Sequence, residues 1–426
     1  MKISVELTMD IRDNNLAESV ARLSGAGCVI SRIVALSRDL QITRYQIDII
    51  YDDPSAFKRC IASFDDESGR YTVIHLKNYL DELLSHGFLH VRGSMRIDTP
   101  EDYEMNVLGA RQIAHEKILE SDNPLSFTGI KRNVGCITGV KGKNEQAKTV
   151  NASHYIESEI ASVMLSKLAG MNGFPFHLRF DMPEDFLKMI ASIESGFSAM
   201  RISHLDDDDN SEVFDQLPDA LSIPFVSRTH DELTIFALAA ILKMAKKHRC
   251  KIKESNIGFI GLNAASIRLA QLCLRMGCMR VLGFDNNEKC MLTFERQKGL
   301  ATTPENILVN SDIVILMRNH FTEIDLTKMR PGIIVISFLD DPTSIKSFEE
   351  KRSCREIISG EWADSAILYP GIIKGLLSSG KKHLSIDDIT ALSETLAEAE
   401  AQTGKIFPGL FSDIHDKIQK TVCAER

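Results

Sequence analysis

The stretch between residues 252 and 345 constrains the fold more than any other part of the chain. Four short apolar runs within it are typical of buried strands: Asn256–Ile260, Arg280–Phe284, Asp312–Met317 and Gly332–Phe338. Between the first two lies Ala264–Met276, whose apolar residues recur at the spacing of an amphipathic helix. Strands that alternate with helices in this way form parallel sheets. The stretch therefore predicts a Rossmann-type, doubly wound α/β domain.

The turn between the first predicted strand and helix carries part of a dinucleotide-binding pattern. Such a turn uses three glycines, for the tight turn, for close approach of the pyrophosphate and for packing of helix on strand. Only Gly261 is retained; Asn263 stands where the pyrophosphate would approach, and Ser266 is a small replacement for the third glycine. Asp285 ends the second strand, where an acid binds the ribose hydroxyls. Two interpretations stay open: a weakened NAD site, and a Rossmann fold that has lost its nucleotide.

The first 78 residues have a different pattern. Four strands are expected at Lys2–Leu7, Val29–Leu36, Thr43–Ile50 and Tyr71–Leu76, with helices at Leu16–Leu23 and from Asp53 to Ile61. The order βαββαβ is that of a ferredoxin-like sandwich. A dimerisation module and a ligand-sensing module are equally compatible with this pattern.

The rest of the chain completes an α/β protein. Residues 79–130 have helical spacing, residues 131–250 mix helices with short strands, and residues 384–421 are helical. A chain of 426 residues has room for two to four domains at ~100–200 residues each. We expect the boundaries 1–78, 79–222, 223–383 and 384–426, the last part being a helical tail.

Charge and cysteine usage narrow the class of partner and the compartment. The formal net charge of −9 argues against a nucleic-acid partner. No apolar run approaches the ~20 residues of a transmembrane helix, and the first residues lack the build of a signal peptide, so we expect no membrane partner. The nine cysteines show no CxxC spacing, which fits neither a disulfide framework nor a zinc site. We therefore expect a cytoplasmic protein with reduced thiols.

Several segments resemble the short bacterial malic enzymes. They are Lys167–Pro175, Ile223–Val226, Leu238–Leu242 and Leu368–Leu377, and they occur in that family's order. The family's nucleotide turn lies over Gly261–Ile267, and residues 1–78 resemble the ACT-like domain of some bacterial members. The resemblance implies an ACT-like domain, a malic-enzyme N-terminal-like α/β domain and a Rossmann domain. It also implies NAD as cofactor and a homo-oligomer, a dimer.

The residues that carry the chemistry of malic enzymes are not matched. The place of the general-acid tyrosine falls on Asn106, and the place of the general-base lysine falls on Ala161. Neither an amide nor a methyl group can replace a phenol or an amine in proton transfer. Two metal ligands align with Ile202–His204, which holds no carboxylate, and the third lies in the segment matching Ser227–Leu233. The resemblance therefore implies a non-catalytic, ligand-responsive or regulatory homologue with weak NAD binding and no divalent metal.

Two other hypotheses stay open. The metal-binding segments of malic enzymes meet in space, so His204, His230, Asp231 and Glu232 would form a rebuilt site for a metal softer than magnesium. The chain would then be an NAD-dependent oxidoreductase, either a decarboxylating malate dehydrogenase or an enzyme of altered substrate. The simpler interpretation is that these histidines lie in the core or at the surface beside charged turns. A purely structural oligomer is the other hypothesis.

A candidate effector site lies in residues 1–78. In ACT-like domains the loop after the first strand commonly binds the effector. Here Arg12 would bind a small carboxylate, and Asn14 stands beside the N-terminus of the predicted Leu16 helix, whose N–H groups favour anions. The alternative is that Asp13 or Asn14 caps this helix and Arg12 is solvated.

Overall fold

The computed structural model describes residues 2–10, 16–25, 27–38, 42–50, 71–77, 99–102, 104, 107–108, 128–141, 147–203, 205, 211–317, 328–338, 356–359, 365–401 and 406–424. They belong to two compact units, residues 1–92 and residues 93–426, each of which is considered by itself. Four of the predicted site residues lie outside the described residues: Arg12, Asn14, Asn106 and His204.

The first unit contains an antiparallel sheet and a helix. Its elements are β1 (Lys2–Asp10), α1 (Leu16–Gly25), β2 (Val29–Arg38), β3 (Ile42–Ile50) and β4 (Tyr71–Lys77). The strand order is β2-β3-β1-β4, so that β1 pairs with both β3 and β4. Each of the four expected strands is present, as is the first helix. The second expected helix, from Asp53 to Ile61, lies outside the described residues, so the ferredoxin-like order stays a prediction.

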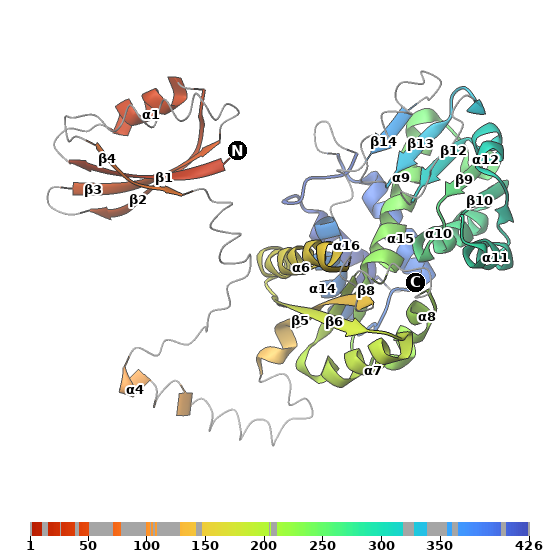
Figure 1. The fold of residues 1–426 in the computed structure, drawn as a ribbon, viewed down its shortest axis with the longest axis horizontal. Coiled ribbons are helices and arrows are strands. Elements are labelled where there is room, and N and C mark those ends of the chain that lie inside the picture. Colours follow the sequence, from red (N-terminus) through yellow and green to blue (C-terminus); the bar gives the residue numbers. More distant parts are fainter. Residues whose placement is uncertain are drawn as a thin grey trace. The chain divides into compact units, whose positions relative to one another are not determined.

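The second unit contains two parallel sheets, of which the first has four strands. They are β5 (Asn133–Lys141), β6 (Asn172–Phe180), β7 (Ala199–Ser203) and β8 (Phe225–Ser227), in the order β6-β5-β7-β8. Helix α6 (Ala147–Met164) continues into a π turn, η5 (Leu165–Ala169), and packs on one face of the sheet, while α7 (Pro183–Ile193) and α8 (Ser211–Ala220) pack on the other (Figure 1). Helix α6 lies very close to β6, because a Cβ atom added to Gly173 would lie 2.3 Å from the Cα of Ser162.

The second sheet confirms the predicted Rossmann-type fold. Its strands are β9 (Asn256–Ile260), β10 (Arg280–Phe284), β11 (Leu300–Ala301), β12 (Ile313–Leu316), β13 (Ile334–Ser337) and β14 (Glu356–Ser359). All are parallel, in the order β11-β10-β9-β12-β13-β14, which is the 3-2-1-4-5-6 order of dinucleotide-binding folds. The described residues of this part include the helices α10 (Ala264–Arg275), α11 (Glu288–Arg296) and α12 (Pro304–Asn310). Strands β9 and β10 span the residues predicted for them.

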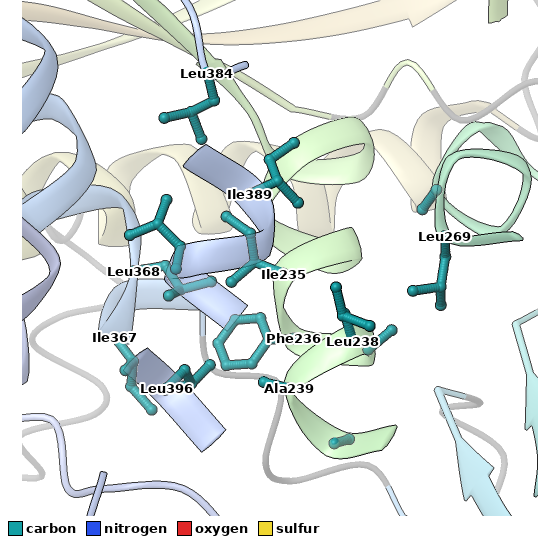
Figure 2. Close-up of a cluster of buried hydrophobic side chains, with 14 of the residues drawn as sticks. Ile235, Phe236, Leu238, Ala239, Leu269, Ile367, Leu368, Leu384, Ile389 and Leu396 are labelled. Carbon is teal, nitrogen blue, oxygen red and sulfur yellow. The ribbon is translucent and has the colours of Figure 1, made fainter. Parts of the chain in front are cut away.

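A buried helix lies at the centre of the second unit. Every residue of α9 (Leu233–His248) from Thr234 to Ile241 is buried, as expected for a helix that is apolar on nearly all sides. It packs directly against α10 and α15 (Ile386–Glu398). The helices α14 (Tyr369–Ser379) and α16 (Ile414–Cys423) contribute side chains to the same hydrophobic core. Figure 2 shows Ile235, Phe236 and Leu238 of α9 within this core. The remaining short elements are α4 (Pro100–Asp102), η4 (Gly129–Arg132), η6 (Glu194–Gly196), η8 (Arg228–Glu232), η9 (Ile252–Glu254) and η11 (Ser365–Ile367).

The C-terminal part of the chain contains helices α15 and α16 in its described residues, and the predicted domain boundaries stay predictions. Strand β8 follows the predicted boundary at residue 222, yet it pairs with β7 and so completes the first sheet. None of the described helices is long and apolar enough to span a membrane.

Candidate functional site

The turn after β9 begins with a glycine in the conformation that a nucleotide-binding turn uses. The N-terminus of the helix that follows, α10, is capped by side chains of the protein. Gly261 has a φ of +90°, a conformation that suits glycine, and its N–H donates to the carbonyl of Phe284 at 2.9 Å. Asn263 is the N-cap of α10. Its Oδ1 accepts from the N–H of Ser266 at 2.9 Å, and its own N–H donates to Ser266 Oγ at 2.7 Å. Asn263 and Ser266 therefore form a capping box, which sequence reasoning did not foresee.

Asp285 lies at the carboxyl end of β10, beside this turn. Its Oδ2 accepts from the N–H of Leu262 at 2.6 Å, and its Oδ1 accepts from the N–H of Asn287 at 2.8 Å. The structure thus brings Asp285 to the glycine turn, as the sequence pattern predicts.

The residues of this turn fit a dinucleotide in part. Gly261 and Asp285 match what a turn and a ribose require. The helix N-terminus fits a pyrophosphate less well, because two of its first N–H groups, those of Asn263 and Ser266, already donate within the capping box. The chemistry that NAD would supply here is hydride acceptance at its nicotinamide ring.

The segments matching the metal-binding segments of malic enzymes lie side by side. Strands β7 and β8 are parallel neighbours, with Ile202 opposite Ser227. From them a buried ion pair forms: Arg201 Nε and Nη2 donate to the two carboxylate oxygens of Glu232, each at 2.8 Å, and the side chains are 4% and 1% exposed. Burial opposes the charge of Arg201, but Glu232 outweighs it and holds the pKa of Arg201 above its ordinary value.

Tyr369, at the start of α14, covers this ion pair. The Arg201 guanidinium carbon lies 4.3 Å from the centre of the Tyr369 ring, which is a cation–π contact. The Tyr369 hydroxyl donates to the main-chain carbonyl of Ala161 on α6, at 3.2 Å. Ala161 itself is 3% exposed, so the position matched to the general-base lysine of malic enzymes is a methyl group in the core.

The second carboxylate of η8 is also paired with an arginine. Asp231 accepts from Arg268 of α10 and, at 2.7 Å, from the N–H of Ser227. Burial alone would raise the pKa of Asp231, but the adjacent His230 ring and the charge of Arg268 outweigh it and lower that pKa to about 2. The same guanidinium lies 2.8 Å from His230 Nδ1 and also contacts the main-chain carbonyl of His230. The His230 ring stacks on Phe214 with 5.2 Å between centroids.

This donor set does not suit a cation. Asp231 and Glu232 each face a guanidinium, and a second positive charge would have to displace it. Within the described residues no group of three or more His, Cys, Asp or Glu side chains is placed to hold a metal ion. The rebuilt metal site also needs His204, which lies outside those residues, so that hypothesis stays a prediction.

Sequence reasoning missed Arg201 and Arg268, and it assigned Glu232 to a rebuilt metal site rather than to an ion pair. A signal for the first was present, because Arg201 interrupts the apolar run Ala199–Ser203, and a charged residue in a buried strand needs a partner. Nothing local identifies that partner, which is 31 residues further along the chain.

Comparisons with known proteins bear out the malic enzyme resemblance. No protein-family model matches the chain. NAD-dependent malic enzyme 1 of Bacillus subtilis is 24% identical over 263 residues, which are 61% of this chain and 60% of that protein. The match thus spans about three fifths of the length of the curated relative.

Solved structures agree on the fold. An NAD-dependent malic enzyme from Thermotoga maritima superposes with a TM-score of 0.68 at 15% identity, covering 82% of this chain and 99% of that one. Malic enzyme from Entamoeba histolytica gives a TM-score of 0.67 at 15% identity, covering 81% of this chain and 79% of that one. The chain is therefore homologous to an NAD-dependent malic enzyme and has the fold of malic enzymes, including a Rossmann-like domain.

Proposed function

We propose, from this homology and from the site, that the chain is a malic-enzyme-like protein that does not oxidise malate and instead acts as a ligand-responsive, regulatory homologue. One observation carries the proposal: both carboxylates of η8 are bound to arginines, Glu232 to Arg201 and Asp231 to Arg268. The segments that would hold a divalent metal thus form an internal ion-pair network.

The position of Ala161 supports the same proposal. Malate oxidation followed by decarboxylation needs a group that removes the hydroxyl proton and a group that returns a proton to the enol. At the matched positions stand Ala161, whose side chain is buried, and Asn106. Each missing acid or base commonly costs ~10²–10⁴ in rate.

Weak binding of NAD is part of the proposal. Asp285 favours NAD over NADP, because a 2′-phosphate would meet a carboxylate. The capping box of Asn263 and Ser266 weakens binding, because it occupies N–H groups that would otherwise face the pyrophosphate. Nucleotide would then serve as a bound ligand rather than as an oxidant.

The decisive experiment is a turnover assay on the full chain. We expect no malate-dependent reduction of NAD or NADP above a buffer blank, with either magnesium or manganese present. Asp285→Ala serves as the matched control, since it removes the ribose-binding group. Turnover by the unmodified protein that disappears in Asp285→Ala would refute the proposal.

A second candidate function is favoured by one observation, the intact 3-2-1-4-5-6 sheet with Asp285 beside its glycine turn. An NAD-dependent oxidoreductase of altered substrate would keep these features and change the residues around β7 and β8. A panel of 2-hydroxy acids with NAD distinguishes the two functions, because only the oxidoreductase would produce NADH with any member of the panel.

For residues 1–78 we propose an ACT-like domain that binds a small anionic metabolite through Arg12. Ligand present far above its dissociation constant should raise the melting temperature, and Arg12→Ala should remove that rise. If no anion in a metabolite screen shifts the melting temperature, this domain serves assembly only. We also propose a homodimer, which light scattering would detect, and a cytoplasmic location, which the lack of CxxC spacing among the nine cysteines supports.

A further inference from the structure

Helix α10 ends in a motif that brings two cysteines together. The N–H of Cys278 donates to the carbonyl of Cys273, and the N–H of Gly277 donates to the carbonyl of Leu274, both at 3.0 Å. Gly277 has a φ of +86°. These two bonds around a left-handed residue define a Schellman motif.

The motif fixes which side chains meet. In a Schellman motif the third residue from the helix end contacts the second residue beyond the C-cap, usually through two apolar side chains. With Met276 as the C-cap of α10, those two residues are Cys273 and Cys278. Neither cysteine is in a disulfide. In α10 the place of this apolar contact is thus taken by the thiols of Cys273 and Cys278.

The surroundings of the pair favour reaction at Cys278. Cys273 is fully buried, whereas Cys278 is 7% exposed and precedes Met279, which is 61% exposed at the surface. The neighbouring Cys273 thiol lowers the pKa of the Cys278 thiol. A lowered pKa increases the share of thiolate, which is the nucleophilic form.

We propose that Cys273 and Cys278 form a reversible disulfide when the protein meets an oxidant of the peroxide class. The Cys278 thiolate attacks one peroxide oxygen, the O–O bond breaks, and the departing oxygen leaves as water after taking a proton, which makes Cys278 a sulfenic acid. The Cys273 sulfur then attacks the Cys278 sulfur, the S–O bond breaks, and a second water leaves with the Cys273 proton. Two thiols are thereby oxidised by two electrons, and one peroxide is reduced to two waters.

The disulfide would join α10 to the turn that precedes β10, at the end of the helix opposite the glycine turn. It would close a short ring of six residues around a turn that is already in place. The proposal rests on the two cysteines of the Schellman motif. Whether the protein binds a nucleotide does not affect it.

The sequence around the pair offers a direct mass-spectrometric test on the full chain. Trypsin cleaves after Arg268, Arg275 and Arg280, so that Cys273 and Cys278 fall in separate peptides, residues 269–275 and 276–280. The folded protein is treated with hydrogen peroxide, denatured in an alkylating reagent and digested. We expect the two peptides to appear joined and lighter by two hydrogen atoms, and to separate after treatment with dithiothreitol.

Matched variants and internal controls complete the test. Cys273→Ser should abolish the joined peptides and leave Cys278 oxidised on its own, whereas Cys423→Ser, which changes an exposed thiol, should leave the joined peptides unchanged. The proposal is overturned if both peptides remain alkylated at peroxide levels that already oxidise Cys423. It is equally overturned if Cys278 proceeds to a sulfinic acid while Cys273 remains alkylated.

Discussion

Removing one partner of the Arg201–Glu232 ion pair should destabilise the protein far more than replacing both partners together. The pair is bidentate, with both hydrogen bonds at 2.8 Å, and its side chains are 4% and 1% exposed. Glu232→Leu would leave the Arg201 guanidinium buried without a carboxylate, and Arg201→Met would do the reverse. Each single change should therefore cost ~3–5 kcal/mol of unfolding free energy.

The double variant should behave differently. With both charges replaced by apolar side chains of similar volume, no uncompensated charge remains, and the result should lie within ~1 kcal/mol of the unmodified protein or be more stable. Independent effects would instead add to ~6–10 kcal/mol, so the expected interaction energy is at least ~5 kcal/mol.

Urea unfolding of the full chain, followed by circular dichroism, measures these differences. The exposed Lys251–Glu254 pair, at 74% and 66% exposure, provides the control: replacing both residues by alanine should leave the unfolding midpoint unchanged. The reasoning fails if the Arg201/Glu232 double variant loses as much stability as the two single variants combined. In that case the destabilisation would come from lost packing rather than from an unpaired charge.

Three further changes test other parts of the structure. Asp231 has a pKa of about 2 against an ordinary 3.8, so its ionised form should contribute ~2 kcal/mol above pH ~4, and that contribution should be lost as the pH falls towards 2. The stability gap between the unmodified protein and Asp231→Asn should narrow over this range, and a gap that is constant with pH would contradict the assignment. Asn263→Gly should tighten NAD binding in calorimetry, because it frees the Ser266 N–H at a helix-capping cost of only a few tenths of a kcal/mol; unchanged affinity would show that the capping box is irrelevant to nucleotide. Gly173→Ala should lower the urea midpoint, because the added Cβ would lie 2.3 Å from the Cα of Ser162, and a variant as stable as the original would disprove that close packing.

Much of the Rossmann-type sheet could be predicted because its signals are local. A strand such as Asn256–Ile260 is buried on both faces, so its sequence is a nearly continuous apolar run. In the helix after it, apolar residues recur at the spacing of a helical turn. Gly261 and Asp285 could be selected for the same reason, since each stands at a definite place relative to a strand end. The likeness to malic enzymes was visible at this level too, in short segments along the chain.

The pairing of charges around η8 was decided by tertiary structure alone. Arg201 contacts Glu232 only because β7 and β8 lie side by side and η8 follows β8 directly. The ring of Tyr369, from α14, then packs on the Arg201 guanidinium. No periodicity encodes a contact between residues so far apart in sequence, because it depends on how sheets and helices pack. The same holds for Asp231, whose partner Arg268 arrives from the helix of the other sheet. Sequence alone thus predicted strands of the Rossmann-type sheet and the residues of its glycine turn. Only the folded chain placed arginines against the carboxylates, because each of those charges needs a partner when it is buried in the core.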